Sequence, residues 1–518
     1  MRWSLRQAQT ELAADAIADG RRCSQVLRHL RFLRQRVRIH TQSEIASVFY
    51  YIMKTGLSMF DPCRAYGLAL VLDRLGAGIS DRDCVQIEDL GGWFRLTGPD
   101  ISSLPSGAPW GAFDDLLAAS DGWCGVLLTT GRTPAESRLS RIGRKNVLGK
   151  VEIVRQVLQQ YPARLHFYLS PVPCDMRSSL AAGFCSLPAS LDASAVKGVR
   201  RPKLNTSTIG DQLYVPEEEW AIALLGGATF VRWVWTHGDY LALLPEPRRI
   251  YLRDHQAACA MENTGYVCGA APRAAAAHHS IRLIRALDRI PAGHDRGDCV
   301  YGNMIFQGMA FVGNQWKSKS SGVFPLELLL RIGDSSSEVA DRLLSMWDSL
   351  FRWASADGNG ALGVALADFL ADPSLARFGH YVRTHSALAI RDGQAVPSYQ
   401  ASWFGALLQL LGQPGWVQLV NDPYVSRVGQ ALGFLVGVGG ECATAVELRY
   451  VGRSEDLSGV LNRFLRRYTA YARGRYNRGL GALFLRVDDI ERVVSLARTS
   501  PGAVRLTAMA LLAHTFVR

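Results

Sequence analysis

Long apolar runs are missing from this sequence, and none reaches the roughly 18 residues that a membrane-spanning helix needs. The first residues also lack the apolar segment and small-residue cleavage site of a secretory signal. The ten cysteines are scattered and form no Cys-x-x-Cys pair, so a zinc finger is not expected. These absences predict a cytoplasmic protein with reduced thiols and no membrane partner.

Sequence signatures of catalysis are missing as well. There is no Gly-x-x-x-x-Gly-Lys-Ser/Thr phosphate-binding loop and no Gly-x-Ser-x-Gly nucleophile elbow. The acidic residues are dispersed along the chain and nominate no pair of carboxylates for acid–base catalysis. We therefore predict that the chain is not an enzyme and that it needs no cofactor.

Positive charge is what the chain has in excess. Its 518 residues carry a formal net charge of +12, and the isoelectric point is about 9.3. Hydrophobic residues make up 48% of the chain, enough for the core of an ordinary globular protein. This balance favours an anionic partner, most often nucleic acid or a membrane surface.

A basic stretch with four interleaved aromatic residues runs from Asn462 to Gly479 and has no acid. As a helix it would place Phe464, Tyr468 and Tyr471 on one face. Its arginines suit nucleic acid because the guanidinium group binds phosphate with two hydrogen bonds and stacks on bases. The simpler reading is a solvated basic face above ordinary core aromatics. The arginines that we expect to contact nucleic acid are Arg463, Arg466, Arg467, Arg473 and Arg475.

Two further basic clusters lie earlier in the chain, and both are predicted as loops. In the first, Lys197, Arg200, Arg201 and Lys203 would grip phosphates. The second combines side chains that read base edges with side chains that neutralise phosphates: Asn314, Gln315, Lys317 and Lys319. Each cluster alone could be an inert surface loop, but three of them on a basic chain favour nucleic-acid binding. An alternative is that the chain is a protein–protein scaffold whose basic residues only keep it soluble.

The order of sequence patterns predicts an α+β fold, with a mixed α/β region containing β-hairpins and then an all-helical bundle. Composition turns helical near residue 335. We therefore expect a basic extension over residues 1–40, a mixed domain over 41–335 and a helical domain over 336–518. The extension, rich in arginine, would be a weakly ordered segment or a nucleic-acid arm.

Within the mixed region, apolar spacing and turn residues predict the individual elements. Helices are expected over Gln42–Leu57, from Asp61 to about Gly76, and over Val151–Gln159, Trp220–Leu225 and Ala274–Leu287. Hairpins are expected over Cys84–Leu96 and Phe230–Leu244, a strand over Leu165–Leu169 and an extended segment over Asp298–Asn314. Leu326–Ile332 fits a helix or a strand. The later helices are expected over Ser336–Phe351, Leu362–Leu370, Tyr399–Leu411, Val425–Val438, Leu457–Gly474, Asp488–Ala497 and 501–518.

Histidines offer the rival hypothesis of a metal-dependent nuclease or phosphohydrolase. His278 and His279 lie on a predicted helix, and His294 and Asp295 follow a short way on. Histidine followed by a His-Asp pair is a ligand pattern of enzymes that bind one or two divalent metals. Here, however, Pro291, Gly293 and Gly297 predict a loop around the pair. A partly exposed histidine pair at a helix end is the simpler interpretation.

Three segments resemble the large subunit of type I CRISPR interference complexes, the Cascade large-subunit family. They are FDPCRAYGLALVLDRLG with the hairpin after it, DYLALLPEPRRIYL, and GNQWKSKSSGVF ahead of the helical region. The arginine-rich residues 1–40 depart from the family pattern, in which the globular fold begins close to the N-terminus.

The resemblance implies a ribonucleoprotein subunit without catalytic activity that acts in antiviral defence. Such a subunit binds the 5′ end of a guide RNA, recognises a short motif that flanks the target DNA, and stabilises the DNA strands. Its implied partners are guide RNA, target DNA, the other subunits of the complex and a helicase-nuclease that it recruits. The basic residues named above are assigned by their chemistry and not by a matched family motif.

Overall fold

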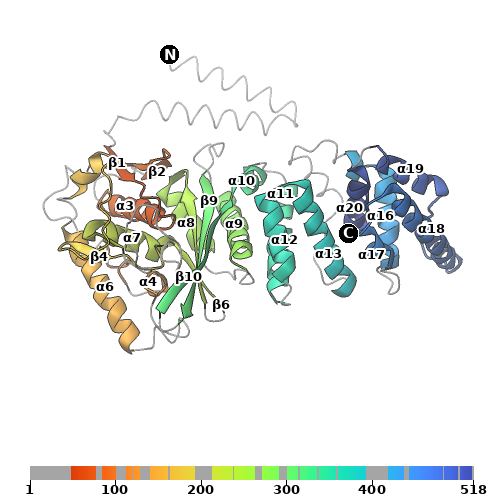
Figure 1. Ribbon diagram of the computed structural model, residues 1–518. Coiled ribbons are helices and arrows are strands. Elements are labelled where there is room, and N and C mark those ends of the chain that lie inside the picture. The colour runs from red at the N-terminus through yellow and green to blue at the C-terminus, as the bar shows by residue number, and fades with distance from the viewer. Residues whose placement is uncertain are drawn as a thin grey trace, which may run out of the picture. The chain divides into compact units, whose positions relative to one another are not determined.

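In the described residues of the structure, a computed structural model, strands and helices are mixed in the first part of the chain and only helices follow (Figure 1). Of the two units into which the chain divides at Val48, Phe49–Arg518 holds all the described residues except Val48 itself. Among the described residues, all strands precede residue 326 and every later element is a helix, which makes the fold α+β as predicted. The structure describes residues 48–76, 85–100, 113–118, 121–128, 141–160, 164–192, 213–236, 239–262, 271–290, 300–312, 315–334, 338–356, 360–392, 418–436, 443–481, 483–499 and 502–515.

The first sheet has four short strands in the order β1-β3-β2-β8, and β2 pairs antiparallel with both of its neighbours. Aromatic and β-branched residues dominate β1, which explains its extended form. Inward-facing residues alternate with partly exposed ones along β3. The strands are β1 (Val48–Met53), β2 (Gln86–Asp89), β3 (Trp93–Gly98) and β8 (Arg249–Tyr251).

Two buried helices, α3 (Phe60–Gly76) and α7 (Glu217–Phe230), pack closely in this part of the chain. Small residues allow the approach, because a Cβ at Gly67 would lie 1.9 Å from the Ile222 carbonyl oxygen. A Cβ at Gly226 would lie 2.0 Å from the Cys63 carbonyl oxygen. Both helices are buried around most of their circumference, so they form the centre of this region's core.

The second sheet is antiparallel in the order β10-β9-β7-β6. Its longest pair is the hairpin of β9 and β10, whose register begins at Val312 opposite Gln315 and shifts between Ser318 and Ser320. The strands are β6 (Arg232–Thr236), β7 (Asp239–Pro247), β9 (Tyr301–Val312) and β10 (Gln315–Pro325). The smaller elements of the first half are α4 (Asp121–Val126), α6 (Arg141–Gln159), the 3₁₀ helix η4 (Leu165–Leu169), β4 (Phe184–Ser186), β5 (Tyr214–Pro216) and α8 (Leu252–Glu262).

Helix α9 (Pro272–Arg289) packs against β9 and β10 and also against the first helices of the later region (Figure 1). Its alanine-rich segment is completely buried, which suits a helix in contact with both a sheet and other helices. The helices that follow are α10 (Glu327–Asp334), α11 (Glu338–Ala356), α12 (Gly360–Ala371) and α13 (Leu375–Asp392).

The last five described helices pack on one another, with α16 and α20 in the closest contact. Gly429 and Gly433 permit this, since a Cβ at either would lie within 3 Å of α20 atoms. His514 at the end of α20 hydrogen-bonds the Val420 carbonyl oxygen at 2.6 Å. These helices are α16 (Pro423–Val436), α17 (Ala443–Leu448), α18 (Ser454–Asn477), α19 (Val487–Ala497) and α20 (Ala503–Thr515).

Most of the predicted elements are confirmed, and three predictions are wrong. The helix expected over Gln42–Leu57 is the strand β1 in its described part, and the strand expected over Leu165–Leu169 is the 3₁₀ helix η4. The basic loop expected from Gln315 onward is the strand β10. Leu326–Ile332, for which the sequence fitted a helix or a strand, falls largely on the helix α10. The helix expected over Tyr399–Leu411 lies outside the described residues, and the domain boundary near residue 335 stays a prediction.

Among the residues that the structure describes, no helix combines the length and the apolar character needed to cross a membrane.

Candidate nucleic-acid interface

Helix α18 begins at Ser454 with two acidic residues, Glu455 and Asp456, in its first turn. Acidic side chains at this end stabilise a helix because they interact with its positive dipole end. One face of α18 is then apolar and buried, as its three- and four-residue spacing predicts. The buried residues of this face are Leu457, Val460, Leu461, Phe464, Tyr468 and Ala472.

Arginines form a row along the opposite face of α18. Arg463, Arg466, Arg467 and Arg473 are all exposed, and their spacing of three, four and ten residues keeps them on one side. From first to last the row spans about 15 Å at 1.5 Å per residue. That length matches about four steps of duplex nucleic acid at 3.4 Å per step. We call these four residues the arginine row.

Counter-charges are few along the arginine row. Arg463 lies 2.6 Å from Glu447 of α17 in an exposed ion pair, which contributes little because solvent screens it. Arg466 and Arg473 make no hydrogen bond or ion pair with any described residue. Arg466 and Arg473 therefore present positive charge to solvent.

Arg475, which the sequence grouped with these residues, lies away from the row. Its Nε donates a hydrogen bond to the Gly481 carbonyl oxygen at 2.9 Å. Its guanidinium group also lies over the rings of Phe434 and Tyr471, with centroid distances of 5.7 and 6.0 Å. These contacts connect α18 to α16 and to the segment after α18, so Arg475 has a structural role.

Aromatic residues of α18 and of the segment after it form a set of packed rings and an exposed pair. The predicted shared face is confirmed for Phe464, Tyr468 and Tyr471, whose successive ring centroids are 5.4 and 6.1 Å apart. Near the helix end, Tyr476 is 67% exposed and meets Phe484, 49% exposed, edge to face at 5.8 Å. Exposed rings beside arginines are the kind of surface on which unpaired bases stack.

The second basic cluster falls on β10. Lys319 is exposed and lies at the shift in register, where its Nζ is 2.7 Å from an Asp239 carboxylate oxygen. Gln315 and Lys317 belong to the same strand. Asn314 and the whole first cluster, Lys197, Arg200, Arg201 and Lys203, lie outside the described residues.

The paired histidines lie inside α9 and are buried, so the prediction of a partly exposed pair at a helix end is wrong. Both have carboxylate neighbours. His278 Nε2 lies 2.8 Å from Asp348 of α11, and burial lowers the pKa of His278 although this carboxylate opposes the effect. His279 Nδ1 lies 3.1 Å from Glu262 of α8, close enough for an ion pair. Burial alone would raise the pKa of Glu262, but the charges of His279 and Arg282 lower it. These contacts join α9 to its neighbouring helices.

A metal centre gains no support from these contacts. Within the described ranges, no three His, Cys, Asp or Glu side chains gather closely enough to hold a metal ion. His294 and Asp295, the other members of the predicted cluster, lie outside those ranges.

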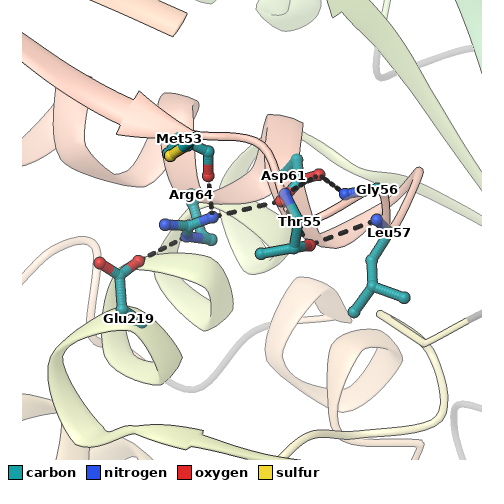
Figure 2. Close-up of polar contacts among 7 residues, drawn as sticks. All are labelled: Met53, Thr55, Gly56, Leu57, Asp61, Arg64 and Glu219. Atoms are coloured by element: carbon teal, nitrogen blue, oxygen red, sulfur yellow. Dashed lines mark hydrogen bonds and ion pairs between the residues drawn. The ribbon is translucent and has the colours of Figure 1, made fainter. Parts of the chain in front are cut away.

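A buried arginine that sequence reasoning did not single out joins β1, α3 and α7 (Figure 2). Arg64, 1% exposed, donates hydrogen bonds to the Met53 carbonyl oxygen at 2.9 Å and to Asp61 at 3.2 Å, and it also pairs with Glu219. Burial alone would lower the pKa of Arg64, but the charges of Glu219 and Asp61 hold it above its usual value.

Asp61 completes this network by binding the turn before α3. It accepts hydrogen bonds from the backbone N–H groups of Thr55 and Gly56, each at 2.9 Å, and from the Thr55 hydroxyl at 2.8 Å (Figure 2). Gly56 has a positive φ of +89°, which glycine adopts without strain. The turn, α3 and α7 are thus fixed by one group of charges.

Comparison with known proteins gives a distant similarity to an archaeal protein. No model of a protein family matches the chain. It is 24% identical over 348 residues to an uncharacterized protein of Archaeoglobus fulgidus, an alignment that covers 65% of this chain and 90% of the relative. The description of that relative states no activity, so the similarity brings no function to this chain.

Proposed function

We propose that this chain is a nucleic-acid-binding subunit without catalytic activity, the large subunit of a type I CRISPR interference complex. In that role it binds the 5′ end of the guide RNA, recognises the motif that flanks the target DNA, stabilises the DNA strands and recruits a helicase-nuclease. Its other partners are the remaining subunits of the complex, and it acts in the cytoplasm.

The arginine row of α18 is the observation that carries the nucleic-acid part of this proposal. Arginine side chains on an exposed helix face neutralise phosphates and displace their counterions, which supplies sequence-independent affinity. The buried aromatic face holds the helix on the bundle, so the row is presented on a rigid element. Tyr476 and Phe484 at the end of the helix add rings for stacking on unpaired bases.

The assignment to a CRISPR complex depends on the sequence resemblance. Its support is the order of the fold, since antiparallel sheets followed by helices agree with what the resemblance implies. Two of the three resembling segments correspond to the helix α3 and to the strand β7 with β8. The metal-dependent alternative with His278, His279, His294 and Asp295 stays a prediction, and no observation favours it.

Recovery of the protein from its native host tests the complex. We expect the tagged chain to co-purify with repeat-derived guide RNA, identified by sequencing, and with companion subunits. The variant R466E/R467E, purified in parallel, should recover the same companion subunits with less target DNA. Background levels of RNA and no companion subunits with the unaltered chain would contradict the proposal.

A further inference from the structure

A cavity of about 370 Å³ lies between α13, α20 and the segment that joins α17 to α18. This volume falls at the lower end of the range for ligand pockets, about 300–1,000 Å³. Tyr450, one of its lining residues, is 76% exposed. It belongs to none of the basic clusters that the sequence predicted.

Three arginines from separate elements line this cavity. Arg383 belongs to α13, Arg449 follows α17 and Arg505 belongs to α20, and no carboxylate is among the lining residues. None of the three forms an ion pair with a described residue, and Arg449 Nε is buried without a hydrogen-bond partner. Like charges that converge without a counter-charge repel each other, so an anion that enters between them is attracted by all three.

The remainder of the lining is apolar and aromatic. Met509 and Leu512 contribute one turn of α20, and Gly379 of α13 leaves room for Met509, whose sulfur would be 2.6 Å from a Cβ there. The Tyr450 ring lies beside the Arg449 guanidinium, with 5.6 Å between the guanidinium carbon and the ring centroid. An exposed ring next to a guanidinium group suits a flat, polarisable group such as a nucleobase.

We infer that this cavity binds one nucleotide, with its phosphate between Arg383, Arg449 and Arg505 and its base against Tyr450. Arginine favours phosphate because two parallel N–H groups match two phosphate oxygens. The nucleotide is either free or part of a strand, and the same contacts serve both. The inference stands independently of the arginine row, because the two surfaces share no residue.

Calorimetric titration of the full chain with AMP, with adenosine and with a short single-stranded oligonucleotide tests this inference. The test variants are R449Q, R505Q and Y450A. The control is R342Q, which removes an equal charge from an exposed arginine of α11. We expect AMP or the oligonucleotide to bind the unaltered chain, and R449Q and R505Q each to weaken that binding about tenfold, as loss of a charge-assisted hydrogen bond implies.

The remaining variants and probes separate the two sources of the nucleotide. Y450A should weaken binding about tenfold through lost stacking, adenosine should bind far more weakly than AMP, and R342Q should bind as the unaltered chain does. Loss of AMP binding in the test variants identifies a free nucleotide. If the test variants lose affinity for the oligonucleotide but not for AMP, and this loss adds to any loss caused by R466E/R467E, the bound nucleotide is part of a strand. Unchanged affinities in R449Q and R505Q, with thermal melting as the check of folding, or no binding of any probe to the unaltered chain, would overturn the inference.

Discussion

An arginine near the first sheet and an arginine of the C-terminal helices differ in burial and in ion pairing. Arg64 is buried and makes an ion pair with each of two carboxylates, whereas Arg466 is exposed and has no ion-pair partner among the described residues. A buried charge must be neutralised inside the protein because its removal from water costs several kcal/mol. An exposed charge keeps its hydration and remains available to a partner. The comparison separates arginines that hold the fold from arginines that can bind.

Buried histidines differ in whether a carboxylate lies beside them. His278 and His279 each lie beside a carboxylate. His255 forms no ion pair with a described residue: its ring stacks on Tyr66, and it hydrogen-bonds the Tyr301 hydroxyl at 2.7 Å. Burial, with a smaller effect of His279, lowers the pKa of His255 to about 3. This residue is therefore neutral in the folded protein at neutral pH.

The largest expected effect comes from replacing the buried arginine, Arg64. Arg64→Met leaves the Asp61 and Glu219 carboxylates without their buried partner, so we expect the free energy of unfolding to fall by about 3–5 kcal/mol. Urea denaturation measures the change. The control is Arg74→Met on the same helix, where the lost ion pair with Asp115 is exposed and should cost no more than about 1 kcal/mol. Equal losses in the two variants would contradict the distinction.

Burial of His255 without a charged partner is expected to affect the pH dependence of stability. Below a pH of about 6.5 the unfolded chain protonates His255 while the folded chain does not, so stability is lost as the pH falls from about 6.5 towards 3. Between pH 7 and pH 5 this amounts to about 2 kcal/mol. His255→Gln keeps a hydrogen-bonding side chain but cannot titrate, and urea denaturation at both pH values should reveal the smaller loss. An unchanged pH dependence in this variant would refute the assignment.

A smaller effect is expected at the exposed end of α18. Tyr476→Ala should weaken single-stranded DNA binding by about 1 kcal/mol or more, the lower end of what one stacked base contributes. Binding of duplex DNA, whose bases are already stacked, should change less. Tyr476→Phe keeps the ring and serves as the control in the same fluorescence anisotropy titrations. A loss of equal size on both kinds of DNA would argue against stacking.

The smallest expected effect is on the free energy of unfolding when the exposed arginines Arg466 and Arg467 are replaced. R466E/R467E should change the free energy of unfolding by no more than about 0.5 kcal/mol, as surface substitutions usually do. Thermal melting followed by circular dichroism measures it. A loss comparable to that of Arg64→Met would mean that these arginines hold the fold.

Long periodic helices and the hairpins of β2–β3 and β6–β7 were predictable from the sequence, whereas β1 and β10 were not. The α18 pattern has apolar residues every three or four positions over many turns, so the helix and its aromatic face followed directly. β1 was predicted as a helix because Val48, Phe49 and Ile52 also fit helical spacing over so short a run. β10 was predicted as a loop because it is rich in serine and lysine, although the Gly313-Asn314 pair before it is a sequence signal for a two-residue hairpin connection.

Sites assembled from distant segments were beyond sequence reasoning. The arginine row was found because its members lie within one helix, although their common face became clear only from the exposure of each residue. Arg383, Arg449 and Arg505 share no spacing that would group them. Arg64 was not singled out from the sequence, because no local sequence feature distinguishes a buried arginine from an exposed one. Its partner Glu219 lies 155 residues away.

The most direct test of the arginine row is the salt dependence of nucleic-acid binding. The test compares the affinities of three proteins over a series of salt concentrations: the unaltered chain, R466E/R467E and the control R289E/R331E. The control changes two exposed arginines, one on α9 and one on α10, by the same charge. We expect R466E/R467E alone to bind more weakly and to flatten the slope of log affinity against log salt by about 1.5, as the loss of two phosphate contacts implies. Equal affinities and equal slopes for all three proteins would contradict the role of the row.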